Sequence, residues 1–110
     1  MTISESLLVK MAETTPGDLA ALVLSGSLST VELSLAAEAA GVIADPATAR
    51  AILDPLLSHP SPLVREGAIY GLSAIRSGDV SAEIQAIATN DTHSGVRRAA
   101  KAILDSWRAQ

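Results

Sequence analysis

Residues 64–68 read Val-Arg-Glu-Gly-Ala, and residues 96–100 read Val-Arg-Arg-Ala-Ala. The two stretches lie 32 residues apart, and each opens an apolar pattern that ends at Ile75 in the first copy and at Trp107 in the second. The same step backwards relates Ile75 to Ile43. A fixed period of this size is typical of stacked helical repeats, in which each unit buries its apolar face against its neighbours.

The composition of the chain favours closely packed helices. Of its 110 residues, 48% are hydrophobic but only 2% are aromatic, with one Tyr, one Trp and no Phe. Strands are enriched in aromatic and β-branched residues, so this composition suits a β-sandwich poorly. The chain has no cysteine, which excludes disulfides and thiolate metal sites. We therefore predict an all-α fold, an α-α superhelix formed by one domain over residues 1–110.

Helix start and stop signals divide the chain into seven helices. A leading helix is expected at 2–14, followed by three helical hairpins at about 16–43, 46–75 and 79–108. Short loops separate all of these segments, so sequential helices should pack antiparallel.

Two capping boxes are expected, at Thr2 with Glu5 and at Ser29 with Glu32, because each pair can satisfy two free main-chain N–H groups. Apolar residues at helical spacing then mark the side of each helix that should face the core. The positions expected to point inward are Leu7, Leu8, Met11, Leu19, Leu22, Val23, Val31, Leu35, Ala39, Val42, Ile52, Leu53, Leu56, Leu57, Val64, Ala68, Leu72, Ile75, Ile84, Ile87, Val96, Ala100, Ile103, Leu104 and Trp107.

Gly67 and Gly71 fall at helical spacing in the second helix of the middle hairpin. Each glycine inside a helix costs about 1 kcal/mol relative to alanine. The compensation we expect is close approach of a neighbouring helix of the stack; close approach of a partner is the alternative.

Residues 52–57 and the following residues 60–68 resemble a HEAT repeat, in particular the short HEAT-like kind also seen beside phycobilin lyases. The resemblance covers residues 46–108 and rests on the Val-Arg-x-x-Ala opening of the second helix. The first hairpin departs from it, since Leu33 stands where the arginine should be, so this hairpin is either a degenerate repeat or a cap. The resemblance implies a right-handed stack whose second helices line a concave face, and it implies the roles of that family, which serves as scaffold, as adaptor and occasionally as enzyme.

If that face binds a partner, the resemblance implies a row of outward residues on the second helices. An Ile-Tyr pair facing water would make an interface anchor, because Tyr is enriched at binding hot spots; packing against another helix of the chain is the alternative. The row runs from an acidic to a basic end, and its partner-binding residues are Glu38, Glu66, Ile69, Tyr70, Ser73, Arg98, Lys101 and Asp105, accompanied by Ser34 and Ala37.

Four residues are predicted to have structural roles. Arg65 and Arg97 are equivalent positions that should tie each second helix to the preceding turn, with Asp91 accepting from Arg97. The alternative is a guanidinium pair that binds a carboxylate or phosphate. Trp107 should close the end of the stack.

Nothing in the sequence marks a catalytic site, so we expect a non-enzymatic protein without a cofactor. The two histidines, His59 and His93, lie at non-equivalent turn positions without clustered carboxylates, whereas zinc takes three or four ligands. No Gly-x-Ser-x-Gly elbow and no glycine-rich phosphate loop is present.

Charge and hydropathy bound the class of partner. The net charge of −4 argues against a general nucleic-acid binder, although the cluster Arg97, Arg98, Lys101 and Arg108 leaves weak binding as an alternative. No apolar run reaches the roughly 18 residues of a membrane span, and the start of the chain lacks a secretory pattern, so a cytoplasmic location is expected. A protein partner is the first expectation; a subunit of a larger assembly, such as a viral particle or a homo-oligomer joined through the stack ends, is the other.

Overall fold

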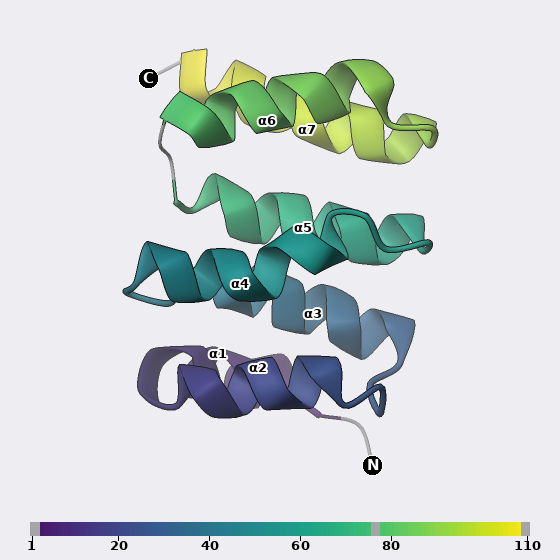
Figure 1. Ribbon diagram of the computed structural model, residues 1–110. Helices are drawn as coiled ribbons and strands as arrows, with labels where there is room; N and C mark the ends of the chain where they lie inside the picture. The colour runs from purple at the N-terminus through teal and green to yellow at the C-terminus, as the bar shows by residue number, and fades with distance from the viewer. Residues whose placement is uncertain (1–2, 76–77, 109–110) are drawn as a thin grey trace.

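The computed structural model describes residues 3–75 and 78–108, and this part of the chain forms seven α-helices and no strand (Figure 1). The all-α prediction is therefore confirmed. The helices are α1 (Glu5–Thr14), α2 (Pro16–Leu24), α3 (Thr30–Ala40), α4 (Pro46–Leu56), α5 (Pro62–Ser73), α6 (Gly78–Asn90) and α7 (Ser94–Arg108).

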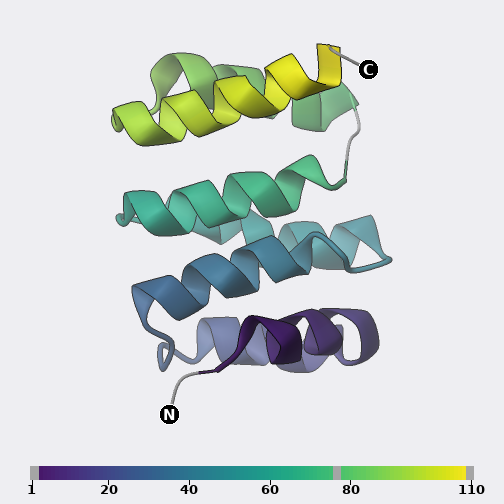
Figure 2. The ribbon, with the colours of Figure 1, turned by 180° about the vertical axis from the view of Figure 1, so that it is seen from behind.

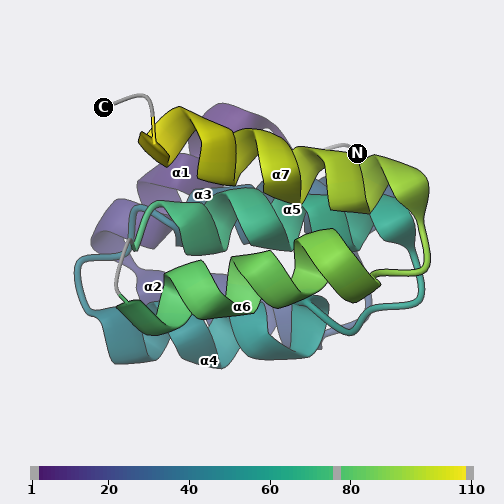
Figure 3. The same cartoon turned by 90° about the horizontal axis from the view of Figure 1, so that it is seen from above.

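The helices are stacked in two layers. Helices α1, α3, α5 and α7 form one layer, which faces the viewer in Figure 2, and α2, α4 and α6 form the other, as the view along the stack in Figure 3 shows. Within the first layer α1 packs on α3, α3 on α5 and α5 on α7. The leading helix α1 thus takes the place of a second helix in the stack and extends the layer that the hairpins build.

Capping side chains decide where the helices begin. Ser4, and not the expected Thr2, caps α1, since its hydroxyl accepts from the main-chain N–H of Leu7 at 3.2 Å; Thr2 lies outside the described residues. The expected capping box of α3 is confirmed, with Ser29 and Glu32 each accepting from the other's main-chain N–H. The second carboxylate oxygen of Glu32 accepts from the N–H of Ile3 at 2.9 Å. These hydrogen bonds, from Ile3 first and then from Ser29, lower the pKa of Glu32, and the bond from Ile3 connects the residues before α1 to α3.

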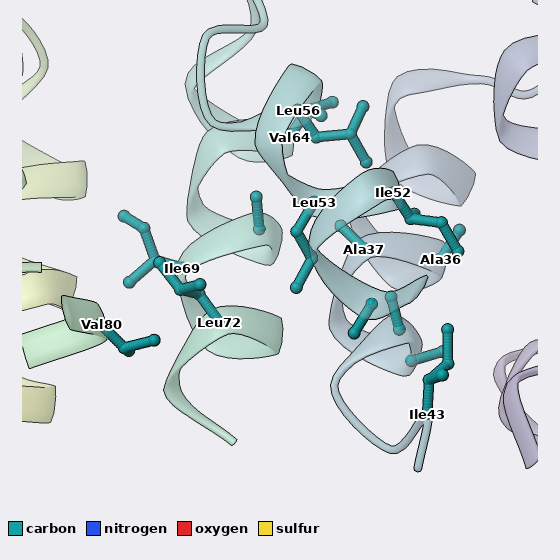
Figure 4. Close-up of a cluster of buried hydrophobic side chains, with 14 of the residues drawn as sticks. Ala36, Ala37, Ile43, Ile52, Leu53, Leu56, Val64, Ile69, Leu72 and Val80 are labelled. Atoms are coloured by element: carbon teal, nitrogen blue, oxygen red, sulfur yellow. The ribbon is translucent and has the colours of Figure 1, made fainter. Parts of the chain in front are cut away.

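The 32-residue period is visible in the core. Val64 and Val96 are both fully buried, and Ala68 and Ala100 are buried at the equivalent positions of α5 and α7. Figure 4 shows Val64 among the side chains of α3, α4 and α5. Equivalent sequence positions therefore occupy equivalent environments, as a repeat requires.

Three predicted core positions are wrong. Val31 and Val42 are 55% and 49% exposed, and Leu7 is 49% exposed. On α3 the buried positions belong to alanines instead, because that helix lies too close to α5 for larger side chains; they are Ala36, Ala37, Ala39 and Ala40. Val31 lies in the first turn of α3, and Val42 lies two residues beyond its last residue, Ala40.

The glycines of α5 explain that close approach. A Cβ on Gly67 would overlap the main-chain oxygen of Ser34, and a Cβ on Gly71 would overlap that of Ala37. A Cβ on Gly41 would lie 2.6 Å from the oxygen of Gly71. The contact between α3 and α5 is the most extensive in the described chain, so the expected approach of a neighbouring helix is confirmed.

Candidate protein-interaction surface

A groove opens on the outer surface of α1, α3 and α5. It has a volume of about 380 Å³. Glu38 and Tyr70, which are 32 residues apart and therefore equivalent in the repeat, both line it. Its full lining is Glu5 and Val9 from α1, Glu38, Ala39 and Val42 from α3 and the turn after it, and Tyr70, Ser73 and Ala74 from the end of α5.

The wall of the groove is largely apolar. Tyr70 is 40% exposed and Val42 is 49% exposed, although both carry large apolar groups. The Ser73 hydroxyl donates to the main-chain oxygen of Tyr70 at 2.6 Å, so its hydrogen is directed at the helix. Two half-exposed apolar side chains in one hollow indicate a binding site more strongly than single ones scattered over the surface, because binding sites expose apolar groups together.

Among the described residues, the charged side chains that line the groove are both carboxylates. Glu5 and Glu38 form no ion pair with any of the described residues. Helices α3 and α5 both end at the groove, and neither has a basic residue in its last turn. The aligned peptide dipoles of a helix add partial negative charge at its C-terminus. This part of the surface therefore favours a cation.

The structure divides the row of partner-binding residues predicted from the sequence. Glu38, Tyr70 and Ser73 come together in the groove. Ile69, expected to face water beside Tyr70, is fully buried, and Figure 4 shows it on the side of α5 that faces Val80 of α6. The prediction for Ile69 was wrong because its helix position points along the stack, toward the next repeat, and only its neighbour Tyr70 points outward.

Packing against a neighbouring helix also buries other residues of the predicted row, wholly or in part. Ala37 is fully buried beneath Gly71, and Glu66 and Ser34 are half-buried. On α7 the corresponding positions are exposed, because no helix of the described chain packs over them.

The basic end of the row is a separate feature. Lys101 and Asp105 line a second hollow of about 260 Å³ between α6 and α7. Arg98 is exposed and lines neither hollow. Arg108 lies 3.8 Å from Asp105, in a pair that is largely exposed.

The two repeat arginines are bound to turns, and Asp91 accepts from Arg97 as expected, but through its main-chain oxygen and not through its carboxylate. Its carboxylate accepts from Arg65 of the preceding repeat, at 3.0 Å from Nε and 3.1 Å from Nη2. Arg97 donates instead to the main-chain oxygen of Asp91 at 2.6 Å, just as Arg65 donates to the oxygen of His59 at 2.8 Å. The side chain of Asp91 therefore joins two repeats, and its main chain holds α7 to its own turn.

Asp91 is also electrostatically distinct. Burial is the largest single influence and raises the pKa of its carboxyl group. The hydrogen bonds from Arg65 and from the main-chain N–H of His93, together with the charge of Arg65, outweigh burial and hold the pKa below its ordinary value. Trp107, the fourth residue given a structural role, is half-buried and packs against the core.

Sequence reasoning missed one link between repeats and five residues of the groove, which are Glu5, Val9, Ala39, Val42 and Ala74. Val9 and Glu5 reach the groove because α1 lies in the layer of the second helices, and no repeat signal in the sequence placed it there. Val42 was expected to be buried. The ion pair of Arg50 with Glu83, at 2.8 Å, connects α4 to α6. The sequence could have indicated this pair, because the two residues are separated by close to one repeat period.

The part of the chain that the structure describes holds neither a metal-binding cluster nor a helix that could span a membrane. Over residues 3–75 and 78–108, no group of three or more His, Asp or Glu side chains is placed to hold a metal ion. The nitrogen Nδ1 of His59 and that of His93 each accept from a nearby main-chain N–H, of Ser61 and Gly95. Within the same ranges, every helix is too short or too polar to cross a bilayer.

This two-layer stack with a 32-residue period defines a helical-repeat protein. A family model described as HEAT repeats matches residues 18–104, and the chain belongs to that family. The match begins in α2, so it includes the first hairpin as well as the two hairpins that carry the resemblance most clearly. No curated protein and no solved structure matches the chain. HEAT repeats commonly mediate protein–protein interaction, and the family is generally a non-enzymatic scaffold.

Proposed function

We propose that this chain is a non-enzymatic module that binds a segment of a partner protein on the outer surface of α1, α3 and α5. The observation that carries the proposal is the groove in which Tyr70 and Val42 stand half-exposed beside each other. The side chains that line it come mostly from helices whose packing is set by main-chain contacts, so the groove is held in shape before a partner arrives. A preformed site loses less entropy on binding than a flexible one.

Tyr70 is the expected centre of the interface. Tyrosine combines a large apolar ring with a polar tip and has few rotatable bonds, which is why it is enriched among residues that dominate binding energies. Around it, Val42 and Val9 supply apolar contact, and Glu38 supplies a charge at the rim.

The basic cluster of α7 gives less support to nucleic-acid binding. Arg97 is half-buried and donates to the oxygen of Asp91, so it is already engaged within the fold. Asp105 places a carboxylate among the remaining basic groups. Phosphate binding depends on the number of free basic groups, which both features reduce.

The proposal is tested by placing a photo-crosslinking amino acid at position 70 in the full chain, in the cells that produce it. The matched control carries the same amino acid at Ala86, an exposed residue of α6 in the other layer. We expect one defined protein adduct at position 70, lost on Val42→Asp, and no such adduct at position 86. No adduct at position 70, or the same adduct at both positions, would contradict the proposal.

A further inference from the structure

The size of the groove limits what binds there. At about 380 Å³ it is near the lower end of the range for ligand pockets, about 300–1,000 Å³. A hollow of this size accommodates one large side chain and part of its neighbours. It is therefore suited to a short extended segment of a partner and not to a broad folded surface.

The position of Glu38 points to a cation. Glu38 lies in the last turn of α3, where the helix end already carries partial negative charge. A carboxylate there is unfavourable for the isolated helix, and no described residue pairs with it. Glu5 lines the same groove from α1 and is likewise without an ion pair among the described residues. A bound cation would relieve both charges.

The ring of Tyr70 adds a preference for arginine. Glu38 and Tyr70 occupy the same repeat position on neighbouring helices, and the glycine contacts bring those helices unusually close. A guanidinium group can stack on an aromatic ring while it pairs with a carboxylate through parallel hydrogen bonds. The ammonium group of lysine lacks the planar fork and satisfies only part of this arrangement.

We infer that the groove binds a partner segment in which a bulky aliphatic residue is followed or preceded closely by arginine, with lysine as the weaker substitute. The aliphatic side chain packs on Val9, Val42 and Tyr70, and the guanidinium pairs with Glu38. This inference rests on the proposed function, because it names the class of segment that the same surface receives.

The test selects peptides from a random-peptide phage library on the full-length chain and measures selected synthetic peptides by fluorescence anisotropy. We expect enriched sequences to place Leu, Ile, Val or Met within two positions of Arg. Glu38→Lys should weaken their binding about tenfold or more, the effect of losing one charge-assisted pair. Asp18→Lys is the matched control: it makes the same change of charge on an exposed residue of α2, in the other layer, and should leave binding within about twofold.

The outcomes separate this inference from the proposed function. Peptides that lose binding on Tyr70→Ala but are acidic or uncharged overturn the inference and leave the binding surface in place. Peptides unaffected by Tyr70→Ala and Val42→Ser overturn both. A library that yields no binder counts against the inference. If sedimentation detects dimers, and if these disappear on Tyr70→Ala, a second copy of this chain occupies the groove. That result would also overturn the inference.

Discussion

The two junctions between successive hairpins use the same repeat period but are built from different interactions. Where α3 meets α5, the backbones touch, and Gly67 and Gly71 leave no room for a Cβ. Where α5 meets α7, the equivalent positions are Ala99 and Ile103, and their side chains separate the helices. The contact of α5 with α7 is accordingly much smaller than that of α3 with α5.

Ion pairs link the repeats at the second junction. Arg65 of α5 binds Asp91 before α7, and both side chains are at most 14% exposed. Arg50 of α4 binds Glu83 of α6 across two helices that make no direct backbone approach in the described chain. Figure 1 shows the α6–α7 hairpin stacked at one end of the molecule, next to α5. Repeats of one sequence period can therefore be joined either by main-chain packing or by side-chain ion pairs, and the two kinds of junction differ in their sensitivity to mutation and pH.

The largest effect is expected from breaking the second junction with Asp91→Ala. Removing the carboxylate leaves Arg65 mostly buried without its counter-charge, which costs about 3–5 kcal/mol in the free energy of unfolding. Urea unfolding measures this loss, and hydrogen exchange should show it concentrated in α6 and α7. The control is Asp54→Ala, which breaks an exposed pair with Arg50 and should cost less than about 1 kcal/mol. Equal losses for the two variants would contradict the distinction between the junctions.

The first junction is tested by Gly71→Ala. Alanine favours helix by about 1 kcal/mol, but here its methyl group would overlap the main-chain oxygen of Ala37, which cannot move aside as a side chain can. We expect a net destabilisation of about 1–3 kcal/mol in urea unfolding. Gly17→Ala, at a position in α2 with nothing within 4 Å of the added carbon, should instead stabilise by about 0.4–1 kcal/mol. If Gly71→Ala were also stabilising, close main-chain contact would not hold the first junction.

The smallest effect is the pH dependence of the second junction. Because the pKa of Asp91 is lower in the folded state, its stabilising contribution is complete above the ordinary carboxyl pKa of about 3.9 and is lost as the pH falls through the folded-state value. The difference in unfolding free energy between wild type and Asp91→Asn should therefore be constant near neutral pH and shrink below about pH 4. Glu32, whose pKa is also lowered, is present in both proteins and cancels from this difference. A difference that does not change in acid would contradict the assignment.

Three structural features were predicted correctly because each of them has a recognisable signal in the sequence. The period of 32 residues, the capping box at Ser29 and the close approach at Gly67 and Gly71 are all found in the structure. The cap acts within one turn, whereas the period and the glycines mark contacts between different helices; they can still be recognised in the sequence, because the pattern recurs and because a glycine inside a helix needs compensation. Helical spacing failed for Val31 and Val42, since a stripe of alanines was an equally good apolar face and only the neighbouring helix could select it.

The sequence by itself determined that this chain is a stack of helical hairpins, because its caps and its repeated apolar spacing suit no other fold class. Only the tertiary structure decided the rest. It placed α1 beside α3, buried Ile69 while leaving Tyr70 exposed, and gave the carboxylate of Asp91 to Arg65. Those choices depend on which side of each helix meets the next repeat. Main-chain contact determines that side where α3 meets α5, and larger side chains determine it where α5 meets α7.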